Sequence, residues 1–221
     1  MHYFTQDFLD FFKELSANNY KEWFHANKKR YEASVKNPFL NFLQDLFVEI
    51  KKHDKEFKVD AKDCIARINR DIRFSKDKTP YNLHCTAFAS RGGKKNKEIP
   101  GLFLRFGPEE TGIMGGCYMV PKEQLYGIRK VISSNIPKFR KLIEEKDFVA
   151  KFGSIVGEEH KRIPPEFQDA HKKEPLIAKK QFYYVAQREP ELVLSNDLVG
   201  EIMSYWYTAR PLNEYFTEAM L

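Results

Sequence analysis

The chain has 221 residues, of which 42% are hydrophobic and 31% charged, with a formal net charge of +6. This length is sufficient for a sizeable core and predicts a single domain over residues 1–221. No apolar stretch approaches the roughly 20 residues that span a bilayer, and the start lacks the pattern of a signal peptide, so we expect a cytoplasmic protein without membrane contact.

Three cysteines, Cys64, Cys85 and Cys117, lie far apart in the sequence. An odd number cannot pair fully within the chain, and the sequence contains neither a CxxC motif nor His and Cys residues at zinc-finger spacing. We therefore expect three reduced, mostly buried thiols, with no metal site and no cofactor.

The first zone, residues 1–55, is predicted to be helical. Thr5 is suited to cap a helix in which phenylalanines recur at helical spacing, and the pair Asn18-Asn19 ends that helix. Pro38 occupies the first position of a later helix. That helix has too many phenylalanines and leucines for one narrow stripe, which indicates that it is the most buried of the zone.

The second zone, residues 63–120, is predicted to consist mainly of strands. Residues 83–89 carry almost no charge, and residues 101–106 alternate, with Phe103 and Arg105 on the face opposite the leucines. Residues 113–119 also alternate, and their two adjacent glycines indicate a bulge or a close approach of the backbone. Short connections between these strands favour an antiparallel meander.

The third zone, residues 121–221, is predicted to be mainly helical. The expected elements are helices over residues 122–134, over 137–152 and from about 196 onward with a break near Pro211, and a strand over residues 181–187. Helices on either side of a run of strands indicate an α+β fold. We expect an antiparallel sheet of four or more strands, with the N- and C-terminal helices packed on one side.

The segment from Arg67 to Tyr81 has the pattern most suggestive of function. It places five cations and two carboxylates among regularly spaced apolar residues, unlike an ordinary solvated run of charge. We therefore expect a semi-buried segment whose charges are held in a fixed geometry. Helix and strand both fit the pattern, but the turn-forming residues 75–80 favour an extended start followed by an irregular turn.

One interpretation of this segment is a binding site for a phosphate-bearing or other anionic ligand, because the planar guanidinium of arginine binds such groups through two parallel hydrogen bonds. The candidate ligand-binding residues are Arg67, Arg70, Asp71, Arg73, Asp77, Lys78, Tyr81 and Arg105. We expect the uncovered side of the sheet to carry Arg67, Arg73, Arg105 and Tyr118.

Two alternatives remain open. The segment can be an internal salt-bridge network in which Asp71 and Asp77 neutralise two cations and Glu22 or another helix carboxylate neutralises a third. The protein can also be an enzyme acting on an anionic ligand, with His171 or Asp71 as general base, although the sequence contains no familiar catalytic motif.

Nucleic acid is one form that an anionic partner can take. The sequence has a basic loop at residues 91–97 and a second basic region at residues 161–180. Aromatic residues that could stack on bases are Phe103, Tyr118, Tyr183 and Tyr184. The modest net charge and the lack of a known nucleic-acid motif make this partner possible but not favoured over a solvated lysine surface.

The spacing of Arg67, Arg70-Asp71, Arg73-Phe74, Asp77-Lys78 and Tyr81 resembles the signature of an uncharacterised family that is widespread in bacteria, domain of unknown function 2461. Similar stretches cover nearly the whole chain, from Asn18-Asn19 to Pro211-Leu212. The loop after Pro165 departs from the family pattern, with Glu166 where lysine is common and Lys172 where proline is common. The resemblance implies no established activity, substrate or cofactor, so it leaves the function unknown.

Overall fold

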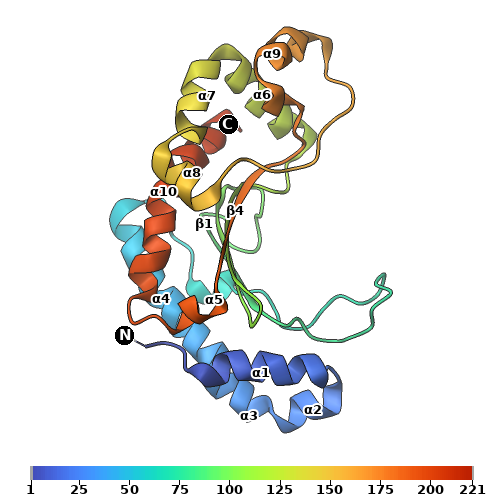
Figure 1. The fold of residues 1–221 in the computed structure, drawn as a ribbon, viewed down its shortest axis with the longest axis vertical. Helices are drawn as coiled ribbons and strands as arrows, with labels where there is room; N and C mark the ends of the chain where they lie inside the picture. Colours follow the sequence, from blue (N-terminus) through green and yellow to red (C-terminus); the bar gives the residue numbers. More distant parts are fainter. Residues whose placement is uncertain (1, 221) are drawn as a thin grey trace.

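The computed structural model describes residues 2–220, and its centre is a four-stranded antiparallel sheet with the order β1-β2-β3-β4 (Figure 1). The strands are β1 (Cys85–Ser90), β2 (Gly101–Phe106), β3 (Thr111–Cys117) and β4 (Phe182–Arg188). The predicted α+β class and the antiparallel meander are confirmed. The fourth strand comes after several helices and pairs with β3.

The N-terminal zone is helical, as predicted. It contains α1 (Gln6–Ala17), α2 (Lys21–Ala26), α3 (Lys28–Tyr31), the π-helical turn η1 (Glu32–Lys36), α4 (Asn37–His53) and the short α5 (Ala61–Cys64). Thr5 is the N-cap residue of α1, although its side chain makes no capping hydrogen bond. Helix α4 buries six of its 17 residues and α1 five of its 12, so α4 has the largest number of buried side chains in this zone but not the largest buried fraction.

The C-terminal zone contains α6 (Lys122–Ser134), α7 (Ile136–Ile143), α8 (Lys146–Phe152), η2 (Pro165–Phe167), α9 (Gln168–Lys173), η3 (Pro175–Ala178), η4 (Pro190–Leu194) and α10 (Leu198–Ala219). The single helix predicted over 137–152 is wrong. A new helix starts at Lys146, because the Glu145 carboxylate accepts a hydrogen bond from the Phe148 N–H at 3.0 Å and caps it.

The predicted break near Pro211 is also wrong, since α10 continues through this residue. Proline removes one hydrogen bond from a helix interior. Here Ala209 and Leu212, on either side of the proline, are both buried in the core. The helix is therefore packed in the core on both sides of Pro211.

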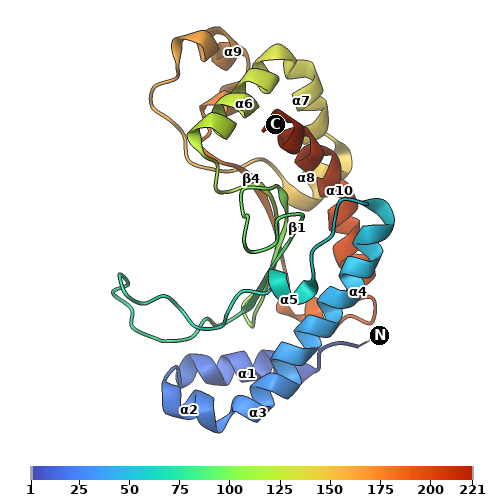
Figure 2. The same ribbon diagram turned by 180° about the vertical axis from the view of Figure 1, so that it is seen from behind.

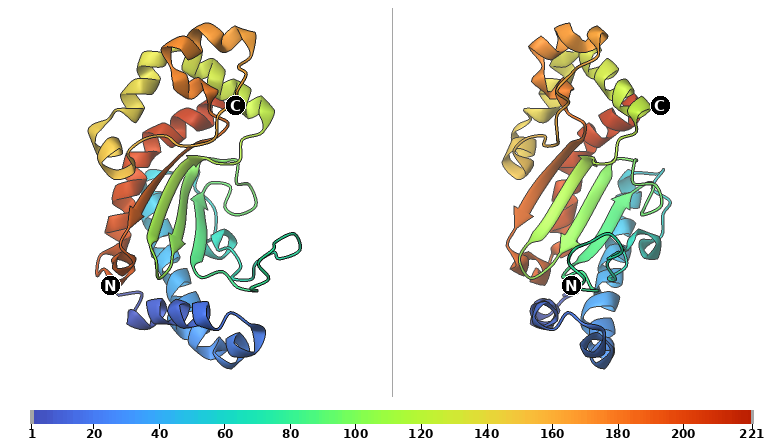
Figure 3. Two further views of the ribbon diagram at one scale, coloured as in Figure 1. Left: turned by 45° about the vertical axis from the view of Figure 1, so that its right-hand side comes forward. Right: turned by 90° about the vertical axis from the view of Figure 1, so that its right-hand side faces the viewer.

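Helices α4 and α10 lie together behind the sheet and cover one of its faces (Figures 2 and 3). Side chains on that face, such as Leu104 and Ile113, are fully buried, whereas Phe103 and Arg105 on the opposite face are only half-buried. Helices α1–α3 lie at one end of the sheet and α6–α9 at the other (Figure 1). Among residues 2–220, no helix covers the opposite face, which we call the open face.

Tyr184 packs on the covered face, so its predicted role as a stacking surface is wrong. Its side chain is 0% exposed, and its hydroxyl donates to Oδ1 of Asn213 at 2.8 Å. A Cβ atom at Gly115 would lie 2.4 Å from the Tyr184 ring, so the predicted close approach at this glycine is confirmed. The alternation of residues in a strand shows which residues share a face of the sheet. It does not show which of the two faces the helices cover.

All three cysteines are buried free thiols, as predicted. Burial raises the pKa of the Cys64 thiol to about 11, so this thiol is protonated at neutral pH. Within residues 2–220, no helix has both the length and the apolar composition needed to cross a membrane.

Candidate ligand-binding groove

Residues 65–83 leave the sheet as a two-stranded arm, which projects on the open side (Figure 1). The arm starts beside β1, where Ile65 pairs with Ala87. Further out, the Arg70 N–H donates to the Pro80 carbonyl at 2.9 Å, and the Asn82 N–H donates to the Ile68 carbonyl at 2.8 Å. The prediction of an extended start followed by a turn is therefore confirmed.

The charges of the arm are largely paired within the arm itself. Arg70 donates to Asp77 and Thr79, and Arg73 donates to Asp71 with an Nη2–Oδ2 distance of 2.7 Å. Hydrogen bonds from the Thr79 N–H and from Arg70 lower the pKa of Asp77 to about 2. These pairs match two of the three pairs that the structural alternative predicts.

The prediction that this segment is semi-buried holds for its base, where Ile68 is half-buried against the core and Tyr81 is buried, but not for its tip. Phe74, near the tip, is 95% exposed, and Arg73 and Lys78 are exposed as well. The arm keeps its shape through its own hydrogen bonds, including one from Lys78 Nζ to the Ile72 carbonyl at 2.9 Å. Of the regularly spaced isoleucines, Ile68 and Ile72 are half-buried, and Ile68 packs against the core.

The arm is held to the N-terminal helices by Asn19, which lies between α1 and α2. Its Nδ2 donates to the Tyr81 carbonyl at 3.0 Å, and its Oδ1 accepts from the Tyr81 N–H at 3.1 Å. The Tyr81 ring stacks on Phe24, with 4.1 Å between ring centroids. In the described part of the chain Glu22 forms no ion pair, so its predicted role as the third carboxylate is wrong.

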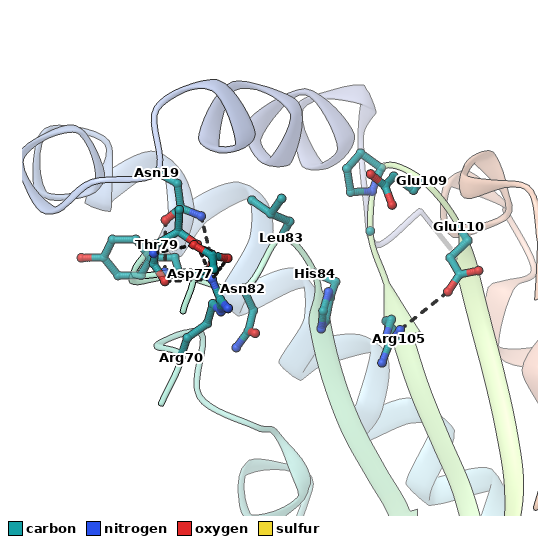
Figure 4. Close-up of a pocket in the computed structure, with 13 residues that line it drawn as sticks. Asn19, Arg70, Asp77, Thr79, Asn82, Leu83, His84, Arg105, Glu109 and Glu110 are labelled. Atoms are coloured by element: carbon teal, nitrogen blue, oxygen red, sulfur yellow. Dashed lines mark hydrogen bonds and ion pairs between the residues drawn. The ribbon is translucent and has the colours of Figure 1, made fainter. Parts of the chain in front are cut away.

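A cavity of about 350 Å³, here called the arm cavity, lies between the base of the arm and the β2–β3 loop (Figure 4). His84 and Arg105 point into it from neighbouring positions, and Arg70 lies across from them. Burial and the positive charge of Arg105 lower the pKa of His84 to about 4, so its imidazole is neutral at physiological pH. The lining also includes the carboxylates of Asp77, Glu109 and Glu110. These three carboxylates outnumber the two arginines, which makes the arm cavity a poor place for an anion.

Arg105 lies on the open face, near the end of β2 that leads into the loop to β3. Its cross-strand neighbours are small, Thr86 on β1 and Gly112 on β3, so its side chain has room to extend. The nearest carboxylate, Glu110, is 3.9 Å from Nη1, too far for a hydrogen bond. The Nε atom is buried and has no hydrogen-bond partner in residues 2–220. The guanidinium therefore keeps donors that no other side chain uses.

A second cavity of about 350 Å³, here called the sheet cavity, lies on the open face beyond Arg105. Arg105 lines both cavities, so the two adjoin at this side chain, and together they are here called the groove. Lys97 adds a second cation, and the lining contains no carboxylate. Its aromatic residues are Phe88, Phe103, Tyr118 and Tyr183.

The structure distributes the predicted site residues over two places. Arg70, Asp77, Tyr81 and Arg105 line the arm cavity, whereas Arg67, Asp71, Arg73 and Lys78 lie along the arm and line neither cavity. Arg105 and Tyr118 both line the sheet cavity on the open face, as predicted. Within residues 2–220 the Arg67 guanidinium makes no hydrogen bond or ion pair.

The candidate general bases, Asp71 and His171, line neither cavity. Sequence reasoning did not assign Asn19, Phe88 or Met114 to the site. The alternation of residues 101–106 identifies the face to which Phe88 and Met114 belong, because both pair with Phe103 across the sheet. No group of three or more His, Cys, Asp or Glu side chains suited to a metal ion occurs among the residues that the structure describes.

The family model described as Conserved hypothetical protein (DUF2461) matches residues 7–215, a span that includes the arm, the sheet and both cavities. The chain belongs to this family. The description names no activity, so family membership adds no substrate or cofactor to the geometry. No curated protein and no solved structure matches the chain.

Proposed function

We propose that this member of the DUF2461 family binds a phosphate-bearing or other anionic ligand in the groove on the open face of the sheet. The observation that carries the proposal is the charge of the sheet cavity, which contains Arg105 and Lys97 and no carboxylate. Cations in a partly enclosed, carboxylate-free cavity create a positive potential that attracts anions.

The hydrogen-bonding state of Arg105 supports this location. The Arg105 side chain is 41% exposed, and its Nη1 lies 3.9 Å from Glu110, so its Nη groups can donate to the oxygens of a bound anion. Two neighbouring N–H groups of a guanidinium can bind two oxygens of one phosphate or carboxylate. Arg105 is therefore the residue to which we assign the main contact with the anion.

The arm has a different role in this proposal. Arg70 and Arg73 are already paired with Asp77 and Asp71, so a ligand at either arginine would have to displace a carboxylate. Arg70, Asp77, Thr79 and Tyr81 then form a wall of the arm cavity, and the ion pair of Arg70 with Asp77 maintains its shape. Arg67 is the arm arginine with a guanidinium available to an additional anion.

Isothermal titration calorimetry with pyrophosphate tests the proposal. We expect the unaltered protein to bind pyrophosphate and Arg105→Met to bind at least about tenfold more weakly, since hydrogen bonds to charged groups contribute about 1.5–3 kcal/mol. Arg73→Met is the matched control, because Arg73 is paired with Asp71 and lies outside both cavities. Thermal melting of each variant verifies its folding.

Two results would contradict the proposal. One is the absence of pyrophosphate binding by the unaltered protein at millimolar concentration. The other is an equal loss of affinity in Arg105→Met and Arg73→Met, which would indicate a diffuse effect of net charge. An affinity that falls as salt is added would agree with an electrostatic contact.

A further inference from the structure

Two pairs of aromatic rings border the sheet cavity, and anion binding alone gives them no role. Phe88 of β1 and Phe103 of β2 are T-shaped, with 4.8 Å between ring centroids. Tyr118, just after β3, and Tyr183 of β4 form a second T-shaped pair at 5.2 Å. The four rings come from β1, β2, the end of β3 and β4, and all of them line the sheet cavity.

None of these four rings is fully buried, since Phe88, Phe103 and Tyr183 are half-buried and Tyr118 is exposed. Tyr118 is 65% exposed, and neighbouring Met119, which also lines the cavity, is exposed too. Lys97 Nζ lies 4.6 Å from the Phe88 ring centroid, so a cation already stacks on one of these faces. Apolar surface that stays accessible in a concave site is typical of ligand binding.

We propose that the ligand carries a planar ring beside its anionic group and is a nucleotide, either free or as a unit of a single-stranded nucleic acid. This inference rests on the proposed function, because the anion is assigned to Arg105. Phe103 lies two positions before Arg105 on the same face of β2, which separates their Cα atoms by about 7 Å. A nucleotide places its base and its phosphate at a similar spacing, joined by the sugar.

The lining also predicts how selective the site is. No Asn, Gln, Asp or Glu side chain lines the sheet cavity, so it lacks the groups that pair with adenine or cytosine, and Arg105, which could pair with guanine, is assigned to the phosphate. Stacking on aromatic rings tolerates every base. The protein therefore binds purine and pyrimidine nucleotides with similar affinity.

A free nucleotide fits the groove better than a long strand. Beyond Arg105 the groove continues into the arm cavity, where Asp77, Glu109 and Glu110 would repel a second phosphate. One phosphate at Arg105 with one base in the sheet cavity avoids these carboxylates.

Calorimetric titration with AMP, adenosine, pyrophosphate and a thymidine decanucleotide tests the inference. We expect AMP to bind at least about tenfold more tightly than pyrophosphate or adenosine. Tyr118→Ser is expected to weaken AMP binding at least about fivefold and to leave pyrophosphate binding unchanged, because it removes a stacking surface and no charge. Tyr126→Ser is the matched control, since Tyr126 is also exposed and also forms a T-shaped pair, with Phe167 on another part of the surface.

The outcomes separate the two proposals. Equal affinity for AMP and pyrophosphate, or equal weakening of both by Tyr118→Ser, would overturn the ring site and leave the anion site standing. No binding of either compound would overturn both. If adenosine binds as tightly as AMP, the phosphate adds nothing to the affinity, and the proposal that the site binds a ring and an anionic group of one ligand is overturned. If the decanucleotide binds far more tightly than AMP and with the same dependence on Tyr118, the recognition of a base together with a phosphate is supported. The ligand is then a single-stranded nucleic acid and not a free nucleotide.

Discussion

Replacing Asn19 by alanine removes both side-chain hydrogen bonds that hold the arm against the N-terminal helices. Nδ2 donates to the Tyr81 carbonyl at 3.0 Å, and Oδ1 accepts from the Tyr81 N–H at 3.1 Å. Tyr81 is 4% exposed, so water has little access to the two backbone groups that the substitution leaves without a partner. The variant therefore loses more than an exposed asparagine would.

The size of this loss follows from the two hydrogen bonds. Each contributes about 1 kcal/mol, and the poorly solvated N–H and carbonyl groups of Tyr81 raise the expected loss in the free energy of unfolding to about 2–4 kcal/mol. For a domain of this size, about 1 kcal/mol lowers the melting temperature by about 2–4 °C. We expect the melting temperature of Asn19→Ala to fall by roughly 5–10 °C.

Urea unfolding and thermal melting followed by circular dichroism measure this loss, and Asn18→Ala is the matched control. Asn18 Nδ2 donates to the Glu14 carbonyl at the exposed end of α1, so its loss is expected to cost less than about 1 kcal/mol. Hydrogen exchange adds a local measurement, because the amides of Arg70 and Asn82 bond across the arm and should exchange faster in Asn19→Ala. Equal losses in the two variants, or unchanged exchange in the arm, would refute the assignment of Asn19 as the anchor.

Three further predictions concern other parts of the molecule. The pKa of His84 is about 4 in the folded state and about 6.5 in the unfolded chain, so the unfolded state binds the extra proton and stability falls as the pH decreases from about 6.5 to 4. When the pH is lowered from 7 to 4.5, the free energy of unfolding measured with urea should fall by about 1–2 kcal/mol less in His84→Gln than in the unaltered protein. An equal fall in the two proteins would contradict this. Gly116→Ala is expected to lower the free energy of unfolding, measured with urea, by at least about 2 kcal/mol, because φ is +85° and a Cβ would lie 2.2 Å from the Phe182 carbonyl oxygen. A loss below about 0.5 kcal/mol would contradict this backbone conformation at Gly116. Phe74→Ser should change stability by less than about 0.5 kcal/mol in the same assay, since this ring is 95% exposed, and a larger loss would mean that the arm tip packs against another element.

The sequence by itself determined the fold class and most of the secondary structure. The predicted boundaries of β2 and α6 agree with the structure to the residue, because side-chain periodicity depends on positions that are close in the chain. The helix predicted through residues 137–152 failed for a similarly local reason, an acidic cap at Glu145 that periodicity does not reveal. Membership of the DUF2461 family was also determined by the sequence, since the family model matches residues 7–215.

The tertiary structure alone decided which charged groups are paired and which are available. The sequence supplied Asp71, Asp77 and Glu22 as candidate partners for the arm arginines, and the fold uses only the two aspartates. The anchor came instead from Asn19, 62 positions away from the backbone that it holds.

The surroundings of Arg105 in the groove were likewise decided by the tertiary structure and not by the local sequence. Alternation placed it on the same face as Phe103, but its lack of a hydrogen-bond partner at Nε depends on the small residues that adjacent strands bring beside it. Contacts between neighbouring residues follow from backbone geometry, which the local sequence specifies. Contacts between distant residues depend on how whole elements pack, and a cavity is defined by the side chains that packing brings together around it.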